Sequence, residues 1–244
     1  VYFGKDDYIT IEDTLEKIIL AFENEESGSS IKLKKFIEIA KSNYDIAITD
    51  LVYNPGVSPL ELITPATIKK INQFFSTIKK DVRKEFKNDR LVKILEFPVL
   101  FLGAKPSDTP SFYSFMNYAD FGLGTFHPKK GMYEVIKAMK SLAMELGVTI
   151  KTDAPIEKII VENGKAKGLI SKGKIYKSDI VVSGADYHHT ETKLLSSAYQ
   201  SYSPSYWDNR VMAPSSLLFY VGSSKQFPQL LHHNLFFDTD FAKH

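Results

Sequence analysis

The chain has 244 residues, 43% of them apolar and 25% charged, with a formal net charge of +2. This composition is ordinary for a globular protein with a sizeable core, built as one large domain or two smaller ones. No run of about 18 apolar residues occurs, so no membrane-spanning helix is expected. The absence of cysteine excludes a disulfide framework, a thiolate zinc site and a cysteine nucleophile, and is compatible with a reducing cytoplasm.

The first half of the chain predicts mainly helices. No secretory signal is visible, and because the chain begins at Val1 without methionine, we expect the natural N-terminus upstream. Apolar periodicity and cap residues place the elements. A strand pair is expected at 1–3 and 8–11, followed by a helix over 13–24 and a second helix from Ser29 or Ser30 to about 43. Further helices are expected from Thr64-Pro65 to about 88, over 91–101, and from Thr109-Pro110 onward. The second helix would bury Ile31, Leu33, Phe36, Ile37 and Ala40.

The stretch from Phe126 to His189 predicts a helix followed by strands. Apolar residues at helical spacing between Met132 and Leu146 predict one buried face, and Gly147 is a natural C-cap. Asn163-Gly164 is the strongest hairpin turn in the sequence, and Lys172-Gly173-Lys174 makes a second turn. The expected strands are 148–151, 156–161 and 180–182, with 215–221 and 235–237 in a second sheet, and a helix over 190–198. This order predicts a mixed α/β fold.

Positive charge is concentrated in one segment. Between Thr64 and Lys93, nine lysines and arginines face three acids, a net charge of +6. One interpretation is a solvated helix face. The other is attachment to an anionic membrane surface, because the apolar segment Leu91–Leu102 follows directly. Nucleic-acid binding is not favoured, because the segment lacks interleaved exposed aromatics.

Short catalytic and metal-binding motifs are absent. The sequence contains no G-x-G-x-x-G, P-loop, H-E-x-x-H or nucleophile elbow. His188-His189 and His232-His233 are adjacent pairs, and neighbours on a strand point to opposite faces, so no metal site is expected from them. The residues alone therefore indicate a mixed α/β protein that is part of something larger.

The order of several segments resembles bacterial-type phytoene desaturases, in the flavin amine-oxidase superfamily. The segment 126–132 (FHPKKGM) resembles an aromatic-x-Pro-x-Gly-Gly-Met helix entry, 154–159 (APIEKI) resembles A-P-V-E-K-I, and 181–186 (VVSGAD) resembles V-V-S-N-A-D. Leu194-Leu195, residues 215–222 and residues 232–234 also follow the family order. Lys130 stands where the family has glycine, and Gly184 replaces a common asparagine.

The resemblance implies an FAD-dependent enzyme that dehydrogenates a long hydrophobic polyene such as phytoene. It implies cofactor contacts at Ile156, Gly184, Ala185 and Asp186, although Ile156 could equally be a core strand residue and Asp186 the N-cap of the next helix. It points to Glu61 for proton transfer; the alternative is a surface glutamate beside a Pro turn. Six residues could line a substrate tunnel or form core: Phe112, Tyr113, Phe115, Met116, Tyr118 and Phe121.

The resemblance also implies a domain arrangement. Residues 1–127 and 199–244 would form a helical and mixed-sheet substrate domain, with a membrane-facing region at 64–102, and residues 128–198 would be part of an FAD-binding domain with a β-meander. The N-terminal dinucleotide fingerprint and the C-terminal Gly-Asp segment of the superfamily are absent, so we expect a fragment that neither holds FAD tightly nor turns over. The expected location is cytoplasmic, peripheral to a membrane. The alternative is a non-catalytic protein that binds hydrophobic ligands.

Overall fold

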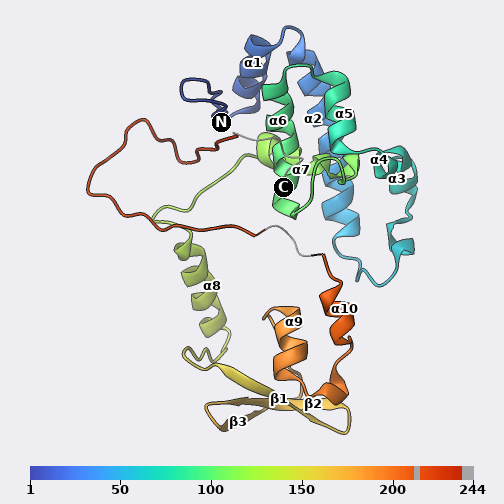
Figure 1. Cartoon of the computed structure of the whole chain (residues 1–244), viewed down its shortest axis with the longest axis vertical. Helices are drawn as coiled ribbons and strands as arrows, with labels where there is room; N and C mark the ends of the chain where they lie inside the picture. The colour runs from blue at the N-terminus through green and yellow to red at the C-terminus, as the bar shows by residue number, and fades with distance from the viewer. Residues whose placement is uncertain (212–214, 238–244) are drawn as a thin grey trace. The chain divides into compact units, whose positions relative to one another are not determined.

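The computed structural model describes residues 1–211 and 215–237. The chain divides into two compact units, one formed by residues 1–126 with the C-terminal segment and the other by residues 127–212 (Figure 1). The sequence placed domain boundaries at 127/128 and 198/199, and the roles that it assigned to these domains stay predictions.

The first unit is helical. Its helices and helical turns are α1 (Leu15–Glu25), α2 (Ser29–Ile46), η1 (Ala47–Leu51), η2 (Pro59–Leu62), α3 (Pro65–Ile68), α4 (Ile71–Phe75), α5 (Ile78–Glu85), α6 (Asp89–Glu96), η3 (Phe97–Leu102), η4 (Ser111–Ser114), α7 (Phe115–Asn117) and η5 (Tyr118–Gly122). The two predicted N-terminal helices are confirmed as α1 and α2. Leu33, Ile37 and Ala40 are buried as predicted, whereas Ile31, in the first turn of α2, is 75% exposed.

The single helix predicted from Thr64 to residue 88 is wrong, because three short helices, α3, α4 and α5, occupy that range. Thr64 caps the first of them as expected, through a bond from the Thr67 backbone N–H. The break before α5 has a local and a distant cause. The Thr77 hydroxyl caps α5, and the backbone at 76–78 bonds to residues 109–111: Ser111 N–H donates to Ser76 O, and Ile78 N–H donates to Thr109 O.

The hydrophobic core of the first unit lies between α1, α2, α5 and α6. Phe22 and Leu33 are fully buried, and Phe22 meets Phe86 edge to face at 6.2 Å. The apolar segment that the sequence assigned to a membrane contributes much of this core: Leu91, Val92, Ile94, Leu95 and Val99 are all at most 4% exposed. Most of the stretch 91–99 therefore packs inside the protein, whereas Phe101 and Leu102 are exposed. No helix in the described ranges is long and apolar enough to cross a membrane.

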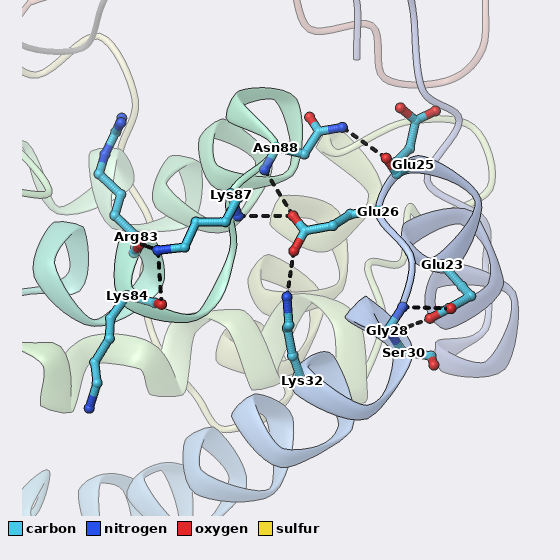
Figure 2. A network of polar contacts seen from close by, with 10 residues as sticks. All are labelled: Glu23, Glu25, Glu26, Gly28, Ser30, Lys32, Arg83, Lys84, Lys87 and Asn88. Carbon is cyan, nitrogen blue, oxygen red and sulfur yellow. Dashed lines mark hydrogen bonds and ion pairs between the residues drawn. The ribbon is translucent and has the colours of Figure 1, made fainter.

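A polar network joins the α1–α2 turn to the α5–α6 junction (Figure 2). The Glu26 carboxylate accepts a bond from the Lys32 ammonium at 2.5 Å and from the backbone N–H groups of Lys87 and Asn88 at 2.9 and 2.8 Å. Burial raises the pKa of Glu26, but these hydrogen bonds outweigh burial and lower it overall. Residues about sixty positions apart are thereby fixed together.

Asn43 makes a second, buried link. Its side-chain amide is fully buried and donates to Gln73 Oε1 in α4, and to Phe112 O and Ser114 Oγ in η4. Phe112, which the sequence offered as tunnel lining or core, is 3% exposed and stacks on Phe74 at 4.7 Å. These contacts attach the short helix α4 to the core.

The second unit carries the sheet. Its elements are α8 (Tyr133–Glu145), β1 (Ile156–Glu162), β2 (Lys165–Ser171), β3 (Lys174–Lys177), α9 (Tyr187–His189), η6 (Thr190–Leu194), η7 (Ser197–Tyr199) and α10 (Pro204–Asp208). The strands form an antiparallel sheet in the order β1-β2-β3, and α9 with η6 lies over one face of it (Figure 1). Ile159 of β1 and Leu194 of η6 are buried there.

Both predicted tight turns are confirmed. Asn163 and Gly164 have φ of 50° and 74°, and Lys172 and Gly173 have φ of 49° and 70°, the left-handed pair that a two-residue hairpin turn requires. Gly147, with φ of 84°, ends α8 as predicted. The mixed α/β fold class is therefore confirmed.

Other expectations are wrong. The residues 148–151, 180–182 and 215–221 form no ladder, and the N-terminal pair and 235–237 reduce to single bridges of Tyr2 with Tyr8 and with Phe236, so the described residues contain no second sheet. The predicted buried face of α8 is exposed: Met139 is 64% and Leu146 75% accessible. These segments have apolar side chains but no packing partner within the described ranges.

Candidate functional site

A large apolar cavity of about 1310 Å³ lies within the first unit. Four segments line it: residues 1, 2, 8–16 and 18; Ile94, Phe97 and Phe101; residues 120–126; and residue 229 with 231–235 and 237. Hydrogen bonds between the two ends of the chain form part of its wall. Tyr2 N–H donates to Leu235 O at 2.7 Å, and Phe237 N–H donates to Tyr2 O at 2.9 Å.

Phenylalanine and tyrosine rings form part of the cavity lining. Phe97 lies 5.0 Å from Phe101 and 5.1 Å from Phe237, measured between ring centroids. Ile9, Ile18, Ile94 and Phe121 line it as well. Polar lining groups include Asp13, Asp120, Thr125 and Asn234, and the Thr125 hydroxyl donates to Asp120 at 2.6 Å. Glu12, Glu16 and the histidine pair 232–233 add further polar groups to the lining. A cavity that combines apolar surface with polar groups suits a ligand that is mainly hydrophobic and is oriented by a few polar contacts.

The sequence located this cavity only in part. Of the six aromatic and methionine residues between 112 and 121 that it offered as tunnel lining, Phe121 alone lines the cavity. The walls from the two ends of the chain were missed. The signal was present, since both 1–3 and 235–237 were predicted as strands, but nothing in the sequence paired one with the other.

The His232-His233 pair lines the same cavity. Its two Nδ1 atoms lie 3.0 Å apart and the ring centroids 4.5 Å apart. The expectation that the two rings point to opposite faces is therefore wrong, because these residues are in irregular chain rather than in a strand. No group of three or more histidine, aspartate or glutamate side chains that could hold a metal occurs in the described part of the chain.

Glu61 caps a loop. Its carboxylate accepts bonds from the backbone N–H groups of Gly56, Val57 and Ser58 at 2.7, 3.0 and 3.0 Å. Together with the bond from Leu60 N–H to the Ser58 hydroxyl, these bonds form a capping box at the start of η2. The position of Glu61 is thus fixed by the chain around it, and its role in proton transfer stays a prediction. Glu61 is not among the cavity-lining residues.

The residues expected to contact a cofactor are in the second unit. Ile156 is the first residue of β1, is 37% exposed and pairs with Ser171 of β2. Asp186 is the N-cap of α9, since its carboxylate accepts a bond from the His189 N–H at 2.8 Å. The loop before α9 is tied down by the 2.8 Å contact between the Ser183 and Thr190 hydroxyls.

The backbone of the loop at 181–185 is open. The backbone N–H groups of these residues donate to no acceptor in the described ranges. A Cβ added at Gly184 would meet nothing within 4 Å, so the backbone is open to a close-approaching group. These residues fit contacts to a cofactor through backbone atoms, as the sequence resemblance implies. The loop at 181–185 contains a single glycine, Gly184, and is not a glycine-rich turn of the kind that holds phosphates.

Lys130 occupies a strained position at the entry to α8. Its φ is 72° and that of Gly131 is 102°, so two successive residues have left-handed backbone. A non-glycine residue there costs about 1–2 kcal/mol. Glycine, which the resemblance implies at this position, would adopt this conformation without that cost.

Comparisons with known proteins identify the family of this chain. A family model described as flavin containing amine oxidoreductase matches residues 66–226. Carotenoid 3,4-desaturase of Haloarcula japonica is 30% identical over 252 residues, covering 100% of this chain and 50% of that protein. The zeta-carotene-forming phytoene desaturase of Myxococcus xanthus is 26% identical, covering 99% of this chain and 47% of the relative. The 4,4'-diapophytoene desaturase of Staphylococcus haemolyticus is 27% identical, covering 99% and 50%.

The chain therefore spans about half the length of the curated relatives that it matches. All three relatives have names that describe desaturation of a carotenoid or its precursor. The family match covers most of α3 to α10 and includes the predicted cofactor segments of the second unit. On these grounds, the chain belongs to the family of flavin containing amine oxidoreductases.

Proposed function

We propose that this chain is part of an FAD-dependent enzyme that dehydrogenates a long hydrophobic polyene, phytoene or a related carotenoid. The observation that carries the proposal is the apolar cavity of about 1310 Å³ in a chain of a flavin enzyme family. The names of the three relatives point to the same substrate class and do not favour a non-catalytic binding protein.

The proposal assigns a task to each unit. The first unit would hold the polyene in the cavity and exclude water from it. The second would form part of the FAD-binding domain, with Ile156 and the residues Gly184, Ala185 and Asp186 next to the cofactor. FAD, when bound, supplies the acceptor for the hydride that leaves one carbon as the new C=C bond forms. The other hydrogen leaves as a proton. The resemblance offers Glu61 as its acceptor, but the Glu61 carboxylate lies outside the cavity lining and accepts three hydrogen bonds from its own loop, so the geometry does not support that role.

The enzyme would work on the cytoplasmic side of a membrane, where a substrate of this kind is dissolved. Cytoplasmic location and peripheral attachment are proposals here, supported by the apolar character of the cavity and by the concentration of lysine and arginine between 64 and 93.

The test is the flavin absorbance of the full-length product of the parent gene, purified in detergent. We expect a yellow protein whose flavin band bleaches when phytoene is added without oxygen. A yellow protein that is indifferent to phytoene and to other polyenes contradicts the substrate class. A colourless protein that cannot be reconstituted with FAD contradicts the enzyme.

Leu231 and Leu230 provide a matched pair of variants for the cavity. Leu231 lines the cavity and Leu230 does not, although the two are adjacent and are 59% and 52% exposed. A tryptophan at 231 would fill space that the ligand needs. We expect Leu231→Trp to raise the KM for the polyene about tenfold, equivalent to about 1.4 kcal/mol, with unchanged FAD content. Leu230→Trp should change neither; equal effects of the two variants would show that the cavity is not the substrate site.

A further inference from the structure

The charged side chains that line the cavity of the first unit are all acidic. Among the described residues, the lining contains no lysine or arginine, but it contains four carboxylates, those of Glu12, Asp13, Glu16 and Asp120. The amino group of Val1, which also lines the cavity, donates to the Ile9 carbonyl oxygen at 2.9 Å. A ligand with a carboxylate or phosphate group would lose its water there without gaining a lysine or arginine partner. The lining therefore selects against anionic ligands.

Three of the four carboxylates are paired with a lysine or lie in solvent. The Lys17 ammonium donates to Asp13 at 2.8 Å and lies 3.7 Å from the carboxylate of Glu12. Glu16 is exposed in the first turn of α1. Asp120 is half-buried, and no lysine or arginine in the described ranges pairs with it. Asp120 is thus the lining carboxylate that is best placed to meet a ligand.

The neutral polar groups of the lining contact one another or the backbone. Both side-chain atoms of the Asn234 amide bond to Leu231, since its nitrogen donates to the carbonyl oxygen at 2.7 Å and its oxygen accepts from the N–H at 3.4 Å. The rings of His232 and His233 are exposed and meet at their Nδ1 atoms. These groups compete less well than Asp120 for a polar group on a bound ligand.

The local backbone holds Asp120 in the cavity wall. Asp120 lies in η5, a π-helical turn that is closed by the bond from Leu123 N–H to Tyr118 O at 3.0 Å. The chain then turns at Gly124, whose φ is 85° and whose N–H donates to Asp120 O at 3.1 Å. This turn brings the Thr125 hydroxyl to the Asp120 carboxylate at 2.6 Å. Single π-helical turns of this kind are frequent at functional sites.

One carboxylate oxygen of Asp120 is left for a ligand. The Thr125 hydroxyl donates to Oδ1 and is the one donor to this carboxylate in the described ranges. A carboxylate forms a strong hydrogen bond with a neutral hydroxyl, and the hydroxyl brings no second charge into an apolar site. A hydrocarbon ligand would leave this oxygen without a partner, whereas a ligand hydroxyl would donate to it.

We propose that the cavity takes a neutral polyene with a hydroxyl group at one end, and that Asp120 accepts a hydrogen bond from this hydroxyl. Thr125 is a positioning residue, because its hydroxyl holds the carboxylate by the other oxygen. The proposal rests on the proposed function and narrows its substrate class. Asp120 determines specificity in this arrangement, and no step of the chemistry passes through it.

The test compares the binding of three ligands to the full-length product of the parent gene, loaded with FAD, in detergent. The ligands are lycopene, lycopene with one terminal hydroxyl group, and lycopene with one terminal carboxylate. We expect the hydroxylated polyene to bind about tenfold more tightly than lycopene, and the carboxylated one to bind more weakly than either. Equal affinities for lycopene and its hydroxylated form would overturn the proposal, as would tightest binding of the carboxylate.

Variants at Asp120 separate the hydroxyl contact from the rest of the cavity. Asp120→Leu should weaken binding of the hydroxylated polyene about tenfold and leave the affinity for lycopene unchanged. Asp120→Asn, which keeps the shape of the side chain, should also reduce the preference for the hydroxyl. Equal losses for both ligands in Asp120→Leu, or a full preference for the hydroxyl in Asp120→Asn, would overturn the contact.

Asp108 provides the matched control. It also accepts a bond from a neighbouring hydroxyl, that of Ser107 at 3.0 Å, but it does not line the cavity. Asp108→Leu should change neither affinity, and a loss equal to that of Asp120→Leu would show that the cavity is not where the hydroxyl binds.

Thr125 is tested by rescue. Thr125→Val should reduce the preference for the hydroxylated polyene, because the Asp120 carboxylate loses the group that holds it. Thr125→Ser keeps a hydroxyl and should restore the preference. A serine variant that binds like the valine variant would overturn the positioning role.

The flavin band distinguishes failure of this proposal from failure of the proposed function. Equal affinities for lycopene and its hydroxylated form, with a flavin band that still bleaches with phytoene, overturn the hydroxyl contact and leave the enzyme. No affinity for any of the three polyenes, with a flavin band that does not bleach, overturns the substrate class as well.

Discussion

Glu23 and Glu26 stabilise the α1–α2 turn in different ways. Glu26 reaches across to the α5–α6 junction, whereas Glu23 bonds only within its own turn, to the backbone N–H groups of Gly28 and Ser30 at 2.7 and 2.8 Å (Figure 2). The Ser30 side chain and these two N–H groups lower the pKa of Glu23 from 4.5 to about 2. A carboxylate in this position stabilises the turn only when it is ionised.

This pKa predicts a pH dependence of stability. Because the folded-state value lies below the unfolded one, the contribution of Glu23 is complete above pH 4.5 and is lost as the pH falls through about 2. We expect Glu23→Gln to lower the urea midpoint of unfolding at neutral pH, and the difference from the parent chain to shrink on acidification. A difference that stays constant down to about pH 2 would contradict the role of the charge. Glu16→Gln, in the first turn of α1, is the control.

Gly168 controls the geometry of the sheet at the level of the element. Its φ is 145°, and a Cβ there would lie 2.1 Å from the Tyr176 carbonyl oxygen in β3. It also sits where the β1–β2 register shifts, between the pairs Ile160↔Gly168 and Val161↔Ala166. A residue with a side chain at this bulge would separate β2 from β3.

We therefore expect Gly168→Ala to destabilise the second unit by about 2–4 kcal/mol, from the backbone conformation and the clash together. Gly173→Ala, in the second hairpin turn, is a control with a left-handed φ of 70° but no atom within 4 Å of the added Cβ. It should cost only about 1 kcal/mol. Equal losses measured by chemical denaturation would contradict the close contact with Tyr176.

Local signals in the sequence predicted elements whose cause is local. The Asn163-Gly164 and Lys172-Gly173 turns, the Thr64 cap and the Gly147 stop each depend on a residue's own backbone preferences, and all four are confirmed. The break between α4 and α5 could not be predicted, since it depends partly on bonds from residues 109–111. The apolar stripe of α8 predicted the helix correctly but not its burial, because burial needs a packing partner that a local pattern does not specify.

The same distinction holds for the candidate site. Resemblance of short motifs points to residues 184–186 as cofactor contacts, which stays a prediction, and Asp186 is the N-cap that the residue type predicts. The cavity required contacts between Tyr2 and residues 235–237, which no local pattern contains. Lys130 departs from the glycine that the resemblance implies, and it has a left-handed φ of 72°.

At the scale of the whole molecule, the two units have separate cores. The core cluster of the first unit includes Phe22, Leu33 and Val82, and that of the second includes Ile159 and Leu194. The single tryptophan, Trp207 in α10, belongs to the second unit, where Tyr187, Tyr202 and Tyr206 surround it at 5.2–5.6 Å. Its fluorescence therefore reports on that unit, while most of the helical signal comes from the first.

We expect the units to unfold independently. Phe22→Ala, at a fully buried position, should lower the stability of the first unit by about 3–5 kcal/mol and shift the circular-dichroism transition. The tryptophan-fluorescence transition should stay where it is. If both transitions move together by the same amount, the two units unfold as one cooperative body.

The exposed face of α8 has a consequence for any ligand titration. Val135, Ile136, Met139, Leu142 and Leu146 are 40–75% accessible, and a water-insoluble polyene will adsorb to such a surface with little selectivity. Total uptake of a coloured ligand by this chain thus measures adsorption and cavity occupancy together. The difference between Leu231→Trp and Leu230→Trp removes the adsorbed background, because both variants keep α8 intact. The uptake of ligand by the cavity is therefore the difference between the two variants. This difference should saturate at one ligand molecule per chain.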